Sequence, residues 1–78
     1  MDQGMLWFDD NPKTDFLQKI KQAADYYKRK YGQSPNLCLV NPAELPRETN
    51  LDDKISIRPY RPILSRHFWI GVSDRTRA

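Results

Sequence analysis

NPKTDFLQKIKQAADYYKRKYG, residues 11–32, decides the fold, because it carries the one long helical pattern of the sequence. Its apolar residues recur at steps of one, three or four positions and form a single stripe at the helical period of about 3.6 residues. These residues are Phe16, Leu17, Ile20, Ala23, Ala24, Tyr27 and Tyr31. Asn11 is a suitable N-cap, Pro12 suits the first helical position, and Gly32 can take the left-handed conformation that ends helices. We therefore predict a helix over about residues 12–31.

Four short segments predict strands, over about residues 5–8, 36–40, 55–58 and 67–72. The second is apolar at consecutive positions, which is typical of a strand covered on both faces. The third and fourth alternate apolar and polar residues, which indicates half-buried strands. The polar residues 47–53 predict a loop, and residues 73–78 predict a frayed basic tail.

These elements follow one another in the order β-α-β-β-β. A helix with one apolar stripe must bury that stripe, and the available partner is the apolar face of the sheet. The predicted fold is therefore α+β, a small two-layer α/β sandwich with one long helix packed on a three- to four-stranded sheet. The other face of the sheet is expected to stay open to solvent or to a partner.

The length of 78 residues predicts a single small domain, with residues 1–78 forming one core. A core of this size stabilises a fold by only about 3–5 kcal/mol, which leaves little for a strained active site. One cysteine excludes an intramolecular disulfide. No signal-peptide pattern or membrane-length apolar run is visible, so we expect a cytoplasmic protein without a membrane partner.

Residues with catalytic chemistry are few. Cys38 and His67 are the single cysteine and histidine, but Cys38 lies in an apolar run, where burial would raise its pKa. The acidic pairs Asp9-Asp10 and Asp52-Asp53 lack the spacing of a metal site, and the three isolated glycines form no phosphate-binding loop. We therefore predict that the protein is not an enzyme and has no catalytic, cofactor-binding or metal-binding residues. We also predict that it uses no cofactor and no small-molecule substrate. A small enzyme that pairs His67 with an acidic residue is the least favoured hypothesis.

The net charge of +3 is distributed in blocks of alternating sign. Residues 1–15 carry −3, residues 16–31 carry +4, residues 32–54 carry −2 and residues 55–78 carry +4. The two positive blocks would make one basic face if they lay side by side. The alternative function is therefore nucleic-acid binding by the basic-aromatic C-terminal segment. Its predicted contact residues are Arg58, Arg61, Arg66, Lys28, Arg29 and Lys30, with Tyr60 and Trp69 to stack on bases.

Our first hypothesis is a non-enzymatic interaction module that binds a partner protein or its own copy. One helix covers only one face of a sheet, so an uncovered face with large apolar side chains would form an interaction site. Tryptophan often dominates the energy of such contacts. The predicted partner-binding residues are Trp69, Trp7 and Tyr60, and Cys38 and Val40 are further candidates for the uncovered face.

Overall fold

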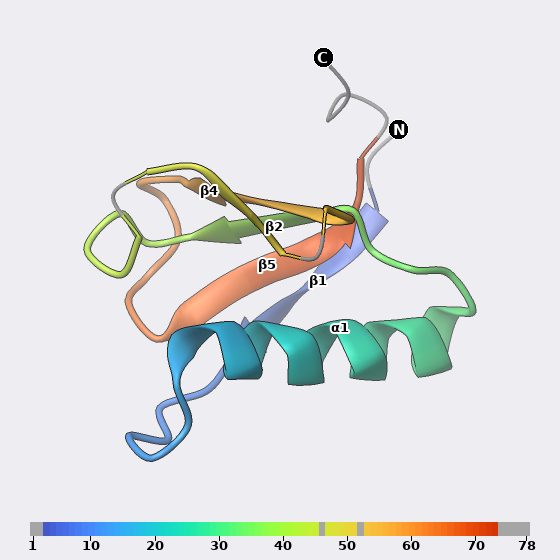
Figure 1. Cartoon of the computed structure of the whole chain (residues 1–78), viewed down its shortest axis with the longest axis horizontal. Helices are drawn as coiled ribbons and strands as arrows, with labels where there is room; N and C mark the ends of the chain where they lie inside the picture. The colour runs from blue at the N-terminus through green and yellow to red at the C-terminus, as the bar shows by residue number, and fades with distance from the viewer. Residues whose placement is uncertain (1–2, 46, 52, 74–78) are drawn as a thin grey trace.

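A five-stranded mixed sheet carries one long helix on one of its faces (Figure 1). The computed structural model describes residues 3–45, 47–51 and 53–73. The elements are β1 (Gln3–Phe8), α1 (Phe16–Tyr31), β2 (Leu37–Val40), β3 (Thr49–Leu51), β4 (Ile55–Pro59) and β5 (His67–Val72). The predicted α+β class is confirmed, and the sheet has five strands where three or four were expected.

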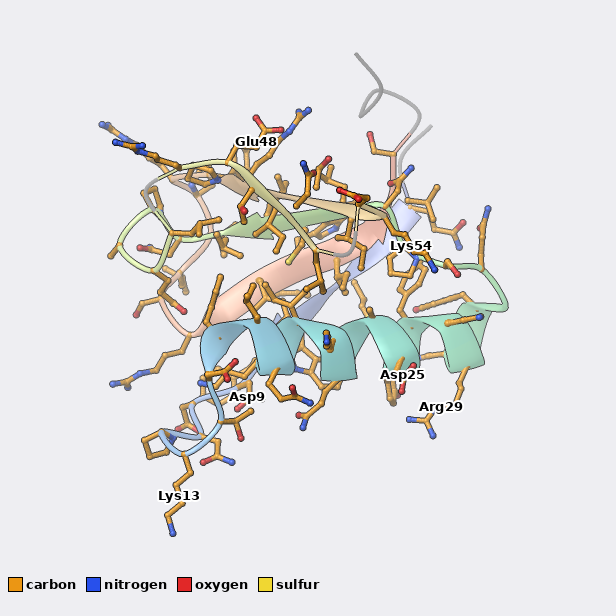
Figure 2. The ribbon with its side chains drawn as sticks, in the orientation of Figure 1. Asp9, Lys13, Asp25, Arg29, Glu48 and Lys54 are labelled. Carbon is orange, nitrogen blue, oxygen red and sulfur yellow. The ribbon has the colours of Figure 1, made fainter. Side chains whose placement is uncertain are left out.

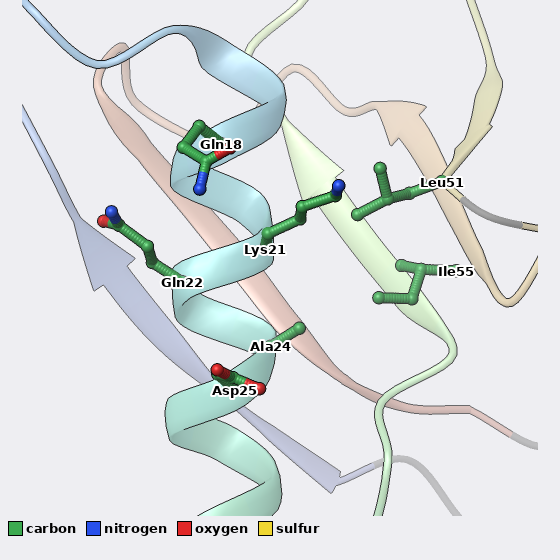
Figure 3. Close-up of a pocket in the computed structure, with 7 residues that line it drawn as sticks. All are labelled: Gln18, Lys21, Gln22, Ala24, Asp25, Leu51 and Ile55. Atoms are coloured by element: carbon green, nitrogen blue, oxygen red, sulfur yellow. The ribbon is translucent and has the colours of Figure 1, made fainter.

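The strands lie in the order β1-β5-β2-β4-β3, so the last strand of the chain lies between the first and the second. The β1–β5, β2–β5 and β3–β4 pairs are antiparallel, and β2–β4 is parallel. Both β1 and β3 are therefore edge strands. Helix α1 crosses over β5, with β1 on one side of it and β2 and β4 on the other (Figure 3).

The helix begins at Phe16, four residues after the predicted start. Asp15 is the N-cap, and its Oδ1 accepts a hydrogen bond from the backbone N–H of Gln18 at 2.8 Å. Asn11 instead organises a turn before the helix, where its Oδ1 accepts from the backbone N–H of Lys13 at 3.0 Å. The sequence offers two capping residues four positions apart, and the second one caps the helix. The C-terminus agrees with the prediction, because Gly32 has a φ of 73°.

Strand β3 corrects the prediction of a loop over residues 47–53. Its side chains show no apolar alternation, but Leu51 is 7% exposed and belongs to the core. A tight turn joins it to β4, in which the N–H of Lys54 donates to the carbonyl of Leu51 at 3.0 Å. Asp53 has a φ of 58°, a left-handed conformation that aspartate tolerates better than most residues.

Ser73 is the first residue of the predicted frayed tail, and the structure holds it firmly. It is 4% exposed, and its N–H donates to Oδ1 of Asn36 at 2.8 Å. Nδ2 of Asn36 donates in turn to the carbonyl of Ser73 at 3.1 Å. The prediction of fraying was wrong for Ser73, and the rest of that tail lies outside the described residues.

The core fills the space between α1 and the sheet. The helix contributes Ile20, Ala23 and Tyr27, all fully buried. The sheet contributes the residues that alternate onto the same face, namely Cys38, Val40, Leu51, Ile55, Ile57, Phe68 and Ile70. Met5 and Trp7 of β1 pack against this cluster from the edge. The sheet therefore has a covered face, and its alternate residues define an open face.

Candidate functional site

Trp69 lies on the open face of the sheet, opposite α1. It alternates with Phe68 and Ile70, which are buried on the covered face. The strand registers place it between Leu6 of β1 and Leu39 of β2, and Leu39 is paired in turn with Arg58 of β4. Side chains of paired residues point to the same face. Leu6, Trp69, Leu39 and Arg58 therefore form one row across four strands.

Two glycines shape the neighbouring row. Gly4 and Gly71 are paired across β1 and β5, two residues from the Leu6–Trp69 pair and on the same face. A β-carbon added to Gly4 would overlap Cζ2 and Cε2 of the Trp69 indole. The indole therefore leans over Gly4, in a place that only glycine leaves free.

The outer part of the open face is apolar and exposed. Leu6 is 63% exposed and Phe8 is 56% exposed, although both are large hydrophobic residues. The ring of Phe8 packs against His67, with 4.8 Å between ring centroids. We call Leu6, Phe8, Leu39 and Trp69 the open-face patch. Arg58 and His67 lie at its rim, so the surface suits an apolar partner that also carries acceptor groups.

Trp7 lies on the covered face and is not part of the open-face patch. Its register partner is Phe68, and its ring packs against Tyr26 of α1, with 5.2 Å between ring centroids. Its Nε1 is buried without a hydrogen-bond partner among the described residues. Cys38 and Val40 also lie on the covered face, which corrects the expectation that they would contribute to an uncovered apolar surface.

Tyr60, the third predicted partner-binding residue, follows the end of β4. Its backbone N–H donates to the carbonyl of Val40 at 2.7 Å, and its carbonyl accepts from the N–H of Ile63 at 3.1 Å. The residue is 48% exposed. The backbone of Tyr60 is therefore fixed by the sheet, while its ring remains accessible at the margin.

The basic residues do not gather on one face. Arg58 lies on the open face, and its Nε is 3.1 Å from Oε2 of Glu48. The cluster Lys28-Arg29-Lys30 lies in the last turn of α1, on the other side of the sheet. In Figure 2, Arg29 lies below one end of the helix and Glu48 lies above the sheet. The sheet therefore separates Arg58 from the helical cluster, so the basic residues that the structure describes do not form one face.

The β4–β5 loop contains Arg61 and Arg66, the other two arginines predicted to contact nucleic acid. Arg61 and Arg66 are exposed, and the carbonyl of Arg66 accepts from the N–H of Asp9 at 3.0 Å. Asp9 lies at the N-terminal end of α1, where its carboxylate is 3.9 Å from the Lys19 ammonium. Lys19 and Arg29 are ten positions apart on the helix, about 15 Å along its axis. Arg66 is therefore distant from the cluster at the helix C-terminus.

Cys38 and His67 lie on opposite faces of the sheet. Cys38 is fully buried on the covered face, and burial raises the pKa of its thiol to about 12. His67 lies on the open face, and its Nδ1 is 2.9 Å from the carbonyl oxygen of Ser65. The described residues contain no group of three histidine, cysteine, aspartate or glutamate side chains able to hold a metal ion. The structure thus places Cys38 in the core, away from His67.

A shallow groove lies between α1 and the β3–β4 hairpin (Figure 3). It has a volume of about 440 Å³. Lys21 and Asp25 lie at its helical side, and Leu51 and Ile55 form its apolar wall. The groove lies between α1, which crosses over β5, and the β3 margin of the covered face. Sequence analysis missed it, since it depends on the strand order.

The chain was compared with protein-family models, curated proteins and solved structures, and none of them matches it. Within the described residues, α1 is too short and too polar to cross a membrane.

Proposed function

We propose that this protein is a non-enzymatic interaction module whose open-face patch binds a partner protein. The supporting observation is the row Leu6–Trp69–Leu39, an apolar surface that spans three adjacent strands. Leu6 is exposed, Trp69 and Leu39 are half-buried, and no helix of the described residues covers them. A partner that covers this surface removes large apolar side chains from water, which contributes roughly 25 cal/mol for each Å² buried. The rigid sheet beneath the patch also reduces the entropy lost on binding.

Trp69 is the expected energetic centre of this interface. Large aromatic residues near the middle of an interface contribute most of the binding energy, and surrounding contacts exclude water from them. Leu6 and Leu39 flank Trp69 in the row, and Arg58 supplies a cation at the rim. Gly4 fixes where the indole lies, so the shape of the patch is preorganised.

The test compares three immobilised forms of the chain: the parent, Leu39→Lys and Leu17→Lys. Leu39 lies directly beside Trp69 in the patch, and Leu17 is a 45% exposed leucine on α1 that serves as the matched control. A protein retained from cell extract by the parent is then purified, and its affinity is measured for each form. We expect Leu39→Lys to weaken binding at least about tenfold, and Leu17→Lys to leave it unchanged. Equal affinity for all three forms would reject the patch.

The row also favours one second candidate, the binding of single-stranded nucleic acid. Trp69 and Arg58 lie on the same face, two strands apart, so a base could stack on the indole while a phosphate meets the guanidinium. Glu48 competes for that guanidinium at 3.1 Å. Anisotropy titrations with labelled oligonucleotides at about 50 and 200 mM salt distinguish the two candidates, because phosphate-driven affinity falls steeply with salt. No binding at the lower salt would reject this candidate.

A further inference from the structure

The two edges of the sheet differ in how well they are protected. Strand β3 is three residues long and is flanked by Glu48 and Asp53. Strand β1 is six residues long, QGMLWF, and contains neither a charge nor a proline. Short edges, charges and prolines are the usual devices that stop edge strands from pairing with other chains. The β1 edge lacks all three.

The backbone of β1 presents a defined set of free groups on this edge. The N–H of Asp9 donates to the carbonyl of Arg66 at 3.0 Å, one step beyond the Phe8–His67 pair. In an antiparallel ladder, alternate residues bond to the same neighbour. Residues 5, 7 and 9 therefore bond toward β5, and Gly4, Leu6 and Phe8 direct their N–H and C=O groups outward. Figure 3 shows β1 as the outermost strand on its side of α1.

We propose that β1 pairs antiparallel with the β1 of a second copy of this chain, about a twofold axis at Leu6. In this register Leu6 lies opposite the partner's Leu6, and Gly4 lies opposite the partner's Phe8. All three outward-facing residues of each strand then exchange hydrogen bonds. The two sheets join into one continuous ten-stranded sheet, since each copy contributes five strands.

The side chains favour the same register. A shift by one residue would place open-face residues opposite covered-face residues, which a half-buried sheet excludes. A shift by two residues would keep the faces but leave outward groups of Phe8 or Gly4 unpaired. At the twofold register, the exposed Phe8 ring lies opposite the partner's Gly4, where it can pack against the Trp69 indole that leans over that glycine. No charged residue of Gln3–Phe8 enters the pairing, so no charge is desolvated.

The identity of the occupant follows from this self-complementarity. When β1 pairs with its own twofold copy, Leu6 meets the partner's Leu6 on the axis, and Gly4 meets the partner's Phe8 on either side of it. The inference does not rest on the proposed function, because it concerns the edge of β1, whereas the proposed function concerns the face. Pairing would also bring the two open-face patches onto one extended surface, through Leu6 and Phe8 of each copy.

The first test is a cysteine at the axis. In a hydrogen-bonded antiparallel pair, facing Cα atoms are about 5.5 Å apart, within the range of about 4.4–6.8 Å that a disulfide spans. Under a mild oxidant such as copper phenanthroline, we expect Leu6→Cys to form a covalent dimer rapidly. Leu64→Cys is the matched control, since Leu64 is 69% exposed and lies in the β4–β5 loop. Cys38 is buried and does not compete. Equal crosslinking of the two variants would overturn the proposal.

The second test removes a hydrogen bond and leaves the face apolar. In Leu6→Pro, the missing N–H is one that points away from β5, so the ladder inside the monomer is kept. Sedimentation equilibrium is expected to show a reversible dimer for the parent and a folded monomer for Leu6→Pro. Leu39→Lys, which disrupts the open-face patch, is expected to remain dimeric. A monomeric parent would refute edge pairing and leave the proposed function standing. Edge pairing would also be refuted if Leu6→Pro dimerised as strongly as the parent.

Discussion

The indole of Trp69 occupies the space that a side chain on Gly4 would fill. Gly4 lies in the edge strand and Trp69 in the strand beside it, and a β-carbon on Gly4 would overlap Cζ2 of the indole. The same β-carbon would lie 2.7 Å from the carbonyl oxygen of Ile70. The position of the largest side chain on the open face is therefore set by a residue that has no side chain.

Gly4→Ala is expected to displace Trp69 and to destabilise the protein by about 1–3 kcal/mol, the range for overpacking a well-packed site. The measurements are urea unfolding and the near-ultraviolet circular dichroism of the native state. Gly32→Ala is the control, because a β-carbon added to Gly32 meets no atom within 4 Å. Any loss of stability in that variant comes from its φ of 73°, which an alanine adopts with strain, and not from overpacking. An unchanged tryptophan signal in Gly4→Ala would contradict the packing described for Trp69.

Asp15→Ala is expected to lower the free energy of unfolding by about 1 kcal/mol, because it removes the hydrogen bond that caps α1. Asp10→Ala is the matched control. It removes the same charge from an exposed residue that makes no hydrogen bond within the described chain. Chemical denaturation measures both variants. Equal losses would show that charge, and not the cap, accounts for the effect.

Cys38 is expected to resist alkylation in the native protein at pH 8. The thiol is fully buried and its pKa is raised to about 12, so it is neither accessible nor ionised. Only the thiolate reacts, and modification should therefore proceed no faster than unfolding exposes the core. Mass spectrometry with iodoacetamide follows the rate with and without urea. Immediate modification of Cys38 without urea would contradict its placement, and Leu64→Cys provides a reactive thiol for comparison.

Stability is expected to fall as the pH rises above about 9. The thiol of Cys38 has its pKa raised from 9.0 to about 12 in the folded state, so the native state holds its proton where the unfolded state loses it. The free energy of unfolding then decreases with pH, by at most about 1.4 kcal/mol per pH unit for one group. Cys38→Ala should weaken this dependence between pH 9 and 10, below the usual titration of tyrosine. An identical slope in that variant would contradict the assignment.

The sequence predicts the helix and most of the strands because their patterns are local. The apolar stripe from Phe16 to Tyr31 has the helical period, and residues 67–72 alternate clearly. The start of α1 was predicted four residues too early, because Asn11 and Asp15 can both cap a helix. Strand β3 has no local pattern, because the pairing with β4 and the burial of Leu51 define it.

The candidate site was predictable only in part. Alternation with Phe68 places Trp69 opposite the core, whatever the strand order. For Trp7 alternation gives no answer, because Met5, Leu6, Trp7 and Phe8 are all apolar. The register with β5 determines the face of Trp7, since Trp7 pairs with Phe68, which is buried on the covered face. The same register reveals Leu6 and Phe8, which the sequence analysis did not select.

The position of β5 has a consequence for synthesis of the chain on the ribosome. This strand is the last to be made, yet β1 and β2 reach each other only through it. Its register partners in β1 lie far back along the chain, because Gln3 pairs with Val72. Such long-range contacts are slow to form and cannot begin before the C-terminal strand leaves the exit tunnel. Until then β1 and β2 have no common neighbour, so the sheet is expected to assemble only after β5 has been synthesised.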